Sequence, residues 1–182
     1  MPKMIIDYFQ KLVLKKSLYP KDAHLIVFNK FNFNYLFAEA MAVMVQKIGE
    51  DLGEDFLFDV GYKAGDNTKE EMFDKMKTNL NSVPKNLQII KSMCEVLGFG
   101  RFDVDKLSPE KGIMSLKVYH NPVIDASVKF FGKDSKVGSL YRGIYSIHAD
   151  KQLKVKNCMF IETKSVCRGD QYNEWSCGIL KR

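Results

Sequence analysis

Apolar residues in the first half of the chain recur at intervals of three and four, which is the spacing of one face of an α-helix. This periodicity predicts helices over residues 35–52, 54–76 and about 83–97. Pro84 falls in the first turn of the third helix and Gly98 follows its last turn, as suits helix boundaries. An amphipathic helix is also predicted over residues 3–16, with a break at residues 19–22. The segment at residues 24–28 is short and rich in β-forming side chains, which indicates a strand.

In the second half the apolar period changes to two, the alternation of a β-strand. Residues 101–104 and 113–119 alternate on either side of a turn at Gly112, which predicts an antiparallel hairpin. A short helix is predicted to begin at Pro122, and a longer one to cover residues 137–150. The last two predicted strands cover residues 153–156 with 158–161, and residues 174–179. The order of elements predicts an α+β fold, with helices packed on one face of a mainly antiparallel sheet.

Size and composition favour one domain over residues 1–182. The chain has 182 residues and is 46% hydrophobic, enough to bury a sizeable core without disulfides. No apolar run approaches the roughly 20 residues that cross a bilayer, so no membrane span is expected. Asp7 and several lysines interrupt the N-terminal apolar stretch, which therefore lacks a signal-peptide core. A cytoplasmic location is the expectation.

The positive charge of the chain is spread along its length. The formal net charge is +6, with only short clusters such as Lys15-Lys16 and Lys181-Arg182. A binder of single-stranded nucleic acid would need a continuous basic stripe with interleaved aromatic residues. Because the sequence has no such stripe, we interpret the charge as a solvated surface, and nucleic acid is not an expected partner.

Five short motifs occur in a characteristic order. They are Gly61-Tyr62-Lys63-Ala64-Gly65, Asn121-Pro122-Val123, Tyr141-Arg142-Gly143, Glu162-Thr163 and Gly169-Asp170. Together they resemble the 4-vinyl reductase (4VR) domain family, also described as predicted hydrocarbon-binding proteins, over about residues 25–180. The resemblance implies a fold of the heme-NO-binding and trafficking-complex (TRAPP) small-subunit type, related to aromatic-sensing domains of bacterial activators. It also implies a homodimer and, in many members, a structural zinc ion.

The resemblance further implies where zinc ligands would lie. The family pattern is Cys, Glu, Cys and Cys with 22, two and seven intervening residues, and on this chain it falls on Ser139, Glu162, Ser165 and Asn173. A structural zinc site needs four thiolate, imidazole or carboxylate ligands. Only the glutamate qualifies, so we expect no zinc here and no other cofactor.

The cysteines leave one alternative open. Cys158, Cys167 and Cys177, together with His148, are candidates for a shifted metal site. The other interpretation is that Cys158 and Cys177 are small buried side chains on facing strands. The sequence contains no CxxC pair that would favour the metal.

Bulky residues beyond the needs of one core face are the candidates for lining an apolar pocket. They are Phe58, Tyr62, Met72, Phe73, Met76, Met93, Phe130, Phe131, Tyr141 and Tyr145. The hydroxyl of Tyr62 or Tyr145 would orient a ligand, although each residue is also compatible with an ordinary core. Gly61, Gly65 and Gly143 would allow a helix to approach closely, against another helix or across a dimer.

Signals for catalysis are sparse. The three histidines, His24, His120 and His148, have no nucleophile at a recognisable spacing, and we name no catalytic residue. A reductase would need a nicotinamide, flavin or iron–sulfur group, and no motif for one is present. The function that the sequence favours is binding or sensing of a hydrophobic small molecule, such as a lipid, an aromatic compound or a tetrapyrrole-like molecule. The alternatives are a reductase or accessory factor in tetrapyrrole metabolism, and a scaffold subunit with a closed pocket.

Overall fold

The computed structural model of the chain describes residues 18–21, 24–27, 31–33, 37–75, 87, 90–91, 94–95, 98–155 and 158–177. The helix predicted over residues 3–16 lies outside this set. Five positions of the helix predicted over about 83–97 are described, and all five are helical. No helix within the described residues is long and apolar enough to cross a membrane.

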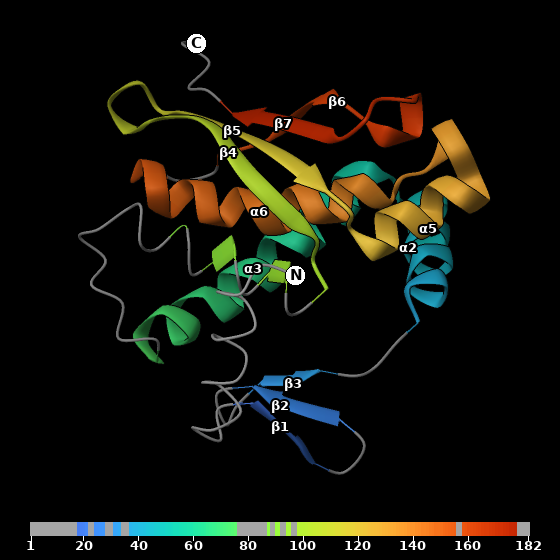
Figure 1. Cartoon of the computed structure of the whole chain (residues 1–182), viewed down its shortest axis with the longest axis horizontal. Helices are drawn as coiled ribbons and strands as arrows, with labels where there is room; N and C mark the ends of the chain where they lie inside the picture. Colours follow the sequence, from blue (N-terminus) through green and yellow to red (C-terminus); the bar gives the residue numbers. More distant parts are fainter. Residues whose placement is uncertain are drawn as a thin grey trace.

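A four-stranded antiparallel sheet forms one layer of the molecule (Figure 1). Its strands, in the spatial order β4-β5-β7-β6, are β4 (Arg101–Ser108), β5 (Ile113–Tyr119), β7 (Asn173–Cys177) and β6 (Ile161–Lys164). On β7 the alternate residues Asn173, Trp175 and Cys177 are buried and face the helices. They pair with Val118, Leu116 and Met114 of β5, which are also buried.

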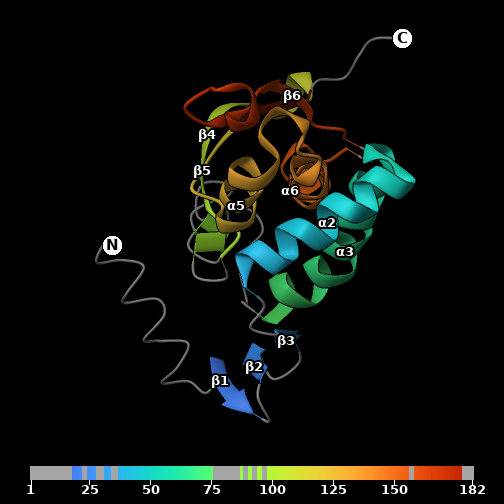
Figure 2. The same ribbon diagram turned by 90° about the vertical axis from the view of Figure 1, so that its right-hand side faces the viewer.

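The helices cover one face of this sheet in two rows (Figure 2). The row next to the sheet contains α5 (Pro122–Phe131) and α6 (Val137–Leu153), and the outer row contains α2 (Ala38–Leu52) and α3 (Glu54–Lys75). The prediction of an α+β fold, with helices on one face of an antiparallel sheet, is confirmed.

The Asn121-Pro122 motif begins α5. Oδ1 of Asn121 accepts hydrogen bonds from the backbone N–H groups of Val123 and Ile124, each at 3.0 Å. Its Nδ2 donates to the carbonyl of Phe99 at 2.8 Å, which ties the helix start to the segment before β4. Pro122 has no N–H group that would be left unbonded in the first turn. The requirements of a helix start therefore explain the Asn121-Pro122 motif.

Helices α3 and α6 touch through their backbones at two glycines. A Cβ added to Gly61 would lie 2.0 Å from the carbonyl oxygen of Leu140, and one added to Gly143 would lie 2.1 Å from a backbone oxygen of α3. No side chain fits at such distances, so both positions require glycine. The close helix approach expected from the sequence is therefore made within the chain, between α3 and α6.

The structure corrects two predicted boundaries. Residue Leu153 ends α6 instead of beginning a strand, and the strand β6 starts only at Ile161. The N–H groups of Cys158 and Phe160 are taken up by side chains of α6, at 2.6 Å from Oδ1 of Asp150 and 3.2 Å from Oγ of Ser146. With these donors bonded to a helix, the segment does not join the strand ladder.

A strand occupies most of the segment at which the N-terminal helix was predicted to break, residues 19–22. Residues Leu18–Lys21 form β1, which pairs with β2 (His24–Val27), and β2 pairs in turn with β3 (Phe31–Phe33). Pro20 is tolerated because β1 is an edge strand, where a missing N–H group costs no ladder bond. The strand predicted at residues 24–28 corresponds to β2.

Candidate functional site

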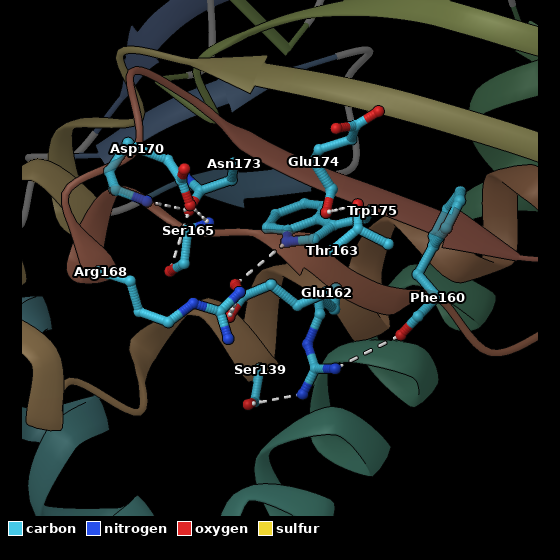
Figure 3. Close-up of polar contacts among 12 residues, drawn as sticks. Ser139, Phe160, Glu162, Thr163, Ser165, Arg168, Asp170, Asn173, Glu174 and Trp175 are labelled. Atoms are coloured by element: carbon cyan, nitrogen blue, oxygen red, sulfur yellow. Dashed lines mark hydrogen bonds and ion pairs between the residues drawn. The ribbon is translucent and has the colours of Figure 1, made fainter.

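The four positions singled out by the family spacing lie around one small polar cavity. Ser139, Glu162, Ser165 and Asn173 line a cavity of about 30 Å³ between the start of α6 and the ends of β6 and β7 (Figure 3). The other residues of its lining are Glu54, Ile124, Ser135, Gly138, Arg142 and Cys167. A cavity of this size holds one or two water molecules or a small ion.

Glu162 is the carboxylate of the family pattern, and it has two protein partners. The indole Nε1 of Trp175 donates to Oε1 at 3.4 Å, and a guanidinium nitrogen of Arg168 lies 3.6 Å from Oε2 (Figure 3). Trp175 is fully buried in the centre of β7. The carboxylate therefore has a neutral donor on one oxygen and a positive charge beside the other.

Ser165 and Asn173 form a second part of the site through the turn that joins β6 and β7. The hydroxyl of Ser165 donates to Oδ1 of Asn173 at 3.5 Å, and the N–H group of Val166 donates to the same oxygen at 3.1 Å. The N–H group of Ser165 donates to Oδ2 of Asp170 at 2.8 Å (Figure 3). Gly169 adopts a left-handed conformation at φ 92°, as the turn predicted at Gly169-Asp170 requires.

Ser139 belongs to a third part, which joins α3 to α6. Its hydroxyl donates to Oε2 of Glu54 at 2.6 Å and accepts from Nη2 of Arg142 at 2.9 Å. Nη1 of Arg142 donates to the carbonyl of Phe160 at 3.4 Å, so the guanidinium connects α6 to the segment just before β6. Lys136 lies 3.7 Å from the other oxygen of Glu54.

This donor set does not fit a structural zinc ion. Two hydroxyls and an amide oxygen take the places of thiolates, and Oδ1 of Asn173 already accepts two hydrogen bonds. The two carboxylates of the cavity, Glu54 and Glu162, face the guanidinium groups of Arg142 and Arg168. Within the described residues, no three histidine, cysteine or acidic side chains are grouped so as to hold a metal.

The cysteines of the alternative site lie in two different places. Cys167 lines the polar cavity near Ser165 and Ser135, and burial raises the pKa of its thiol. Cys177 ends β7 on the side away from the polar cavity, and Cys158 lies in the segment between α6 and β6; interaction between the two thiols raises the pKa of Cys158 and lowers that of Cys177. Four residues of strand, about 13 Å, separate the two ends of β7. The three cysteines therefore do not converge on one metal position.

The predicted pocket residues of α3 and α6 lie in or beside the core. Phe58 is buried and its ring stacks on that of Tyr62 with centroids 6.4 Å apart, while the hydroxyl of Tyr62 donates to Asp150. Tyr145 is 1% exposed, and its hydroxyl donates to the carbonyl of Phe99 at 3.1 Å. Both hydroxyls expected to orient a ligand thus have protein partners.

Aromatic rings fill the space around Tyr145. Its ring centroid lies 5.5 Å from that of Phe102 and 5.5 Å from that of Trp175. Tyr141 is buried near Phe99, with centroids 6.4 Å apart, and burial raises the pKa of its phenol to about 12. Tyr141 and Tyr145 are therefore neighbours of one aromatic cluster between α6 and β4.

The remaining candidates for the pocket lining lie on the surface or are not described by the structure. Phe130 is 46% exposed on α5 and contacts Phe131, with centroids 6.0 Å apart, so it faces away from the interior. Met72 and Phe73 belong to α3, but their side chains are not among those described. Met76 and Met93 lie outside the described residues.

Several residues of the polar cavity carry no sequence signal of their own. Glu54 and Arg168 are isolated charged residues in the sequence, and only the fold brings them beside Ser139 and Glu162. Arg142 lies in the Tyr141-Arg142-Gly143 motif, which could have indicated its role. The motif could therefore have indicated Arg142 as a cavity residue. Glu54 and Arg168 could not be predicted, because they meet their partners through contacts between residues distant in sequence.

The sheet, the two rows of helices and the aromatic interior define an α+β fold found in ligand-binding sensor domains and trafficking-complex subunits. The structure is similar to the phenol-responsive sensory domain of the transcription activator PoxR, solved with phenol, at a TM-score of 0.71 and 12% identity. That similarity covers 100% of this chain and 94% of the other chain.

A second similar structure is trafficking protein particle complex subunit 3 from Naegleria fowleri, covalently bound to palmitic acid. The TM-score is 0.51 at 15% identity, over 78% of this chain and 93% of that one. No protein-family model matches the sequence, and no curated protein is significantly similar to it. At these identities the likeness shows the fold.

Proposed function

We propose that this protein binds a hydrophobic small molecule, aromatic or acyl in character, and acts as a sensor or carrier. The observation that carries the proposal is the fold, which over the full chain resembles a domain solved with phenol. The resemblance to a subunit bound to palmitic acid supports an apolar ligand from a second direction. The motif resemblance to the 4VR family supports the same class of ligand.

The proposed site is the aromatic interior beside α3 and α6. Its described members are Phe58, Tyr62, Tyr141 and Tyr145; Met72, Phe73 and Met93 stay candidates from the sequence alone. Burial of apolar surface would drive binding, at about 25 cal/mol per Å² removed from water. Phe99 borders the same region, because its carbonyl accepts from the hydroxyl of Tyr145, and Cys94 is buried in the same core cluster as Tyr145.

Binding can be tested with phenol and with palmitate as separate probes. The chain has one tryptophan, and Trp175 contacts the ring of Tyr145, so its fluorescence reports on this region. We expect saturable binding of at least one probe by titration calorimetry, with a change in Trp175 fluorescence. Tyr141→Ala should weaken that binding by tenfold or more.

Phe130→Ala is the matched control. It removes a large aromatic side chain from the surface of α5 and should leave the affinity unchanged. Mass spectrometry of solvent extracts from the purified protein would detect a co-purifying molecule. If neither probe binds and the extract is empty, the ligand proposal fails, and the densely packed aromatic interior favours a scaffold with a closed pocket.

We also propose that the protein forms a homodimer through α2 and the start of α3. Phe37, Met44, Ile48 and Leu52 form an exposed apolar stripe along α2, at 82%, 53%, 39% and 59% exposure. An antiparallel two-fold pairing centred on Ile48 would place Met44 of one copy opposite Leu52 of the other. Such self-complementarity is what a two-fold interface requires.

The dimer can be tested by light scattering coupled to size-exclusion chromatography. We expect a mass of two chains for the natural protein and of one chain for the double variant Met44→Glu/Ile48→Glu. Lys133→Glu, which places a carboxylate on an exposed residue away from the stripe, should leave the dimer intact. A natural protein that is monomeric at high concentration would overturn the dimer proposal without affecting the ligand proposal.

A further inference from the structure

Two tyrosine hydroxyls of the aromatic interior donate their protons to acceptors within the protein. The hydroxyl of Tyr62 on α3 donates to Oδ2 of Asp150 on α6. The hydroxyl of Tyr145, also on α6, donates to the carbonyl oxygen of Phe99 at 3.1 Å. The direction of these two hydrogen bonds determines which kind of hydrogen bond each hydroxyl can offer to a bound molecule.

Asp150 acts as an acceptor on both of its side-chain oxygens. It is a buried residue, and Oδ1 accepts from the backbone N–H group of Cys158 at 2.6 Å, while Oδ2 accepts from the hydroxyl of Tyr62. A carboxylate whose two oxygens both face donors has no hydrogen to give. The proton of Tyr62 is therefore directed toward Asp150, and a ligand meets the hydroxyl oxygen of Tyr62 as an acceptor.

The hydroxyl of Tyr145 has the same direction. A carbonyl oxygen has two lone pairs, and that of Phe99 accepts from Tyr145 and from Nδ2 of Asn121, which lies at 2.8 Å. Burial raises the pKa of Tyr145 well above its ordinary value, so the phenol keeps the proton that it donates. Toward a ligand, the oxygen of Tyr145 can accept a hydrogen bond, because its own proton is already used.

The charges around the proposed site favour the same kind of ligand. The described members of the site are one phenylalanine and three tyrosines, and none of these side chains is cationic. The third tyrosine, Tyr141, adds a neutral hydroxyl, because burial raises the pKa of its phenol to about 12. Arg142 on α6 belongs to the polar cavity, where its guanidinium lies 2.9 Å from Oγ of Ser139. A carboxylate buried in the site would meet acceptor oxygens and the like charge of Asp150, whereas a hydroxyl would supply the donor that these oxygens lack.

We propose that the site recognises its ligand as a hydrogen-bond donor: a neutral molecule with a hydroxyl or amino group on an aromatic or acyl frame. Asp150 is the positioning residue for this preference, because it fixes the direction of the Tyr62 hydroxyl. The inference rests on the proposed function and deepens it. It favours phenols and alcohols over the anions of fatty acids, and so distinguishes between the kinds of ligand present in the two similar structures.

Matched probes test the preference on the natural protein. Phenol and toluene have nearly the same shape, but only phenol can donate a hydrogen bond, and benzaldehyde can only accept one. Dodecan-1-ol and dodecanoate have the same chain length and differ in the head group. We expect the hydroxyl compound to bind about tenfold or more tightly than its partners, by titration calorimetry or Trp175 fluorescence. Toluene is more apolar than phenol, so simple transfer into an apolar interior would give the opposite order.

Asp150→Asn tests the positioning role with almost no change in shape. The amide keeps one oxygen for the N–H group of Cys158 and presents an NH₂ group to Tyr62. The hydroxyl of Tyr62 then accepts from the amide and can donate to a ligand. We therefore expect the ratio of the phenol affinity to the benzaldehyde affinity to fall by about fivefold or more.

Tyr145→Phe provides a second test at the other hydroxyl. It removes one acceptor and should lower the preference for phenol over toluene, while the carbonyl of Phe99 keeps its hydrogen bond from Asn121. The matched control is Tyr119→Phe, which removes a hydroxyl from the half-buried last residue of β5. It should leave both affinity ratios unchanged.

The outcomes separate this inference from the proposed function. Toluene or benzaldehyde binding as tightly as phenol, or dodecanoate as tightly as dodecan-1-ol, would overturn the donor preference while leaving the hydrophobic ligand site in place. An unchanged ratio in folded Asp150→Asn would contradict the role of Asp150. If no probe binds, both proposals fail. Because the probes are first compared on the natural protein, a variant that does not fold leaves the test intact.

Discussion

The two ends of β7 face the same helices but have different chemistry. At one end Asn173 lies in a cluster of hydroxyls, carboxylates and guanidinium groups, and at the other end the thiol of Cys177 is buried in the hydrophobic core. Trp175 separates them, fully buried. The family spacing places metal ligands at the polar end, whereas two of the four cysteines lie at the opposite end.

The comparison shows that the groups packed around a buried strand position determine which side chain is stable there. Oδ1 of Asn173 accepts from Ser165 and Val166, and an unbonded partner at such a position costs about 1–3 kcal/mol. Cys177 is 4% exposed and belongs to the hydrophobic core, where it packs as a small apolar side chain. The polar end is thus held by directional bonds, and the thiol end by packing.

The largest expected effect comes from giving the polar end the thiols that it lacks. The triple variant Ser139→Cys/Ser165→Cys/Asn173→Cys would surround the cavity with three thiolates and Glu162, a complete ligand set for zinc. We expect its zinc affinity to exceed that of the natural protein by at least about 10⁴-fold, since structural zinc sites bind with roughly 10 kcal/mol or more. Competition with a coloured chelator measures it.

The control for this experiment is the triple alanine variant at the same positions, which opens the cavity without supplying ligands. It should bind no more zinc than the natural protein. Stoichiometric zinc in the natural protein would contradict our interpretation of the polar end. A folded triple cysteine variant that binds none would show that the cavity does not have the geometry of a metal site.

The next largest effect concerns the packing of α3 against α6, which runs along the length of β7. A Cβ on Gly143 would lie 2.1 Å from a backbone oxygen, whereas a Cβ on Gly65 would meet a methyl group of Ile147 at 3.1 Å and the carbonyl oxygen of Ile144 at 3.2 Å. Gly143→Ala should lower the free energy of unfolding by about 3 kcal/mol or more, because two backbones must separate. Gly65→Ala should change it by less than about 1 kcal/mol, since the gain in helix propensity offsets the contact.

Urea denaturation of both variants, followed by circular dichroism, measures the difference. Gly61→Ala provides a second test at the tight crossing, because its Cβ would lie 2.0 Å from the carbonyl oxygen of Leu140. Equal losses for Gly143→Ala and Gly65→Ala would mean that the crossing is equally tight along its length.

A smaller effect distinguishes the two ends directly. Asn173→Ala leaves the N–H group of Val166 and the hydroxyl of Ser165 without their acceptor, and should cost about 1–3 kcal/mol of unfolding free energy. Cys177→Ala removes one buried sulfur atom and should cost about 1 kcal/mol. Thermal and urea unfolding of the two variants in parallel provides the measurement, and a larger loss for Cys177→Ala would reverse the comparison.

Sequence patterns predict most of the fold because it depends on local signals. The alternation at residues 113–119 corresponds to β5, and the Asn121-Pro122 pair marks the start of α5. The strand predicted at residues 153–156 fails for a tertiary reason, since Asp150 and Ser146 bond the backbone of the following segment. Periodicity cannot detect a donor that a side chain of the preceding helix captures.

The residues of the candidate site were also predictable only where the signal is local. The spacing from Ser139 to Asn173 leads to four residues that share a cavity, because motif order preserves the turns between them. The burial of Cys177 depends on where the sheet register places the end of β7, and the surface position of Phe130 depends on the packing of α5. Both follow from tertiary packing that residue type and spacing do not specify.

The smallest expected effect is a difference in pH dependence between the thiols of the two ends. At the polar end, burial raises the pKa of Cys167 above its ordinary value of 9.0, so its contribution to stability is complete below pH 9 and is lost as pH rises through the folded pKa. At the thiol end, the interaction that lowers the pKa of Cys177 also raises the pKa of Cys158, so the two contributions to the pH dependence of stability act in opposite directions. Between pH 7 and about pH 10, Cys167→Ala should therefore lose less stability with rising pH than the natural protein, whereas Cys177→Ala should follow the natural protein more closely. Measurement of unfolding free energies across this range tests the difference. An equal change of slope in the two variants would mean that the two ends of β7 do not differ in the ionisation of their thiols.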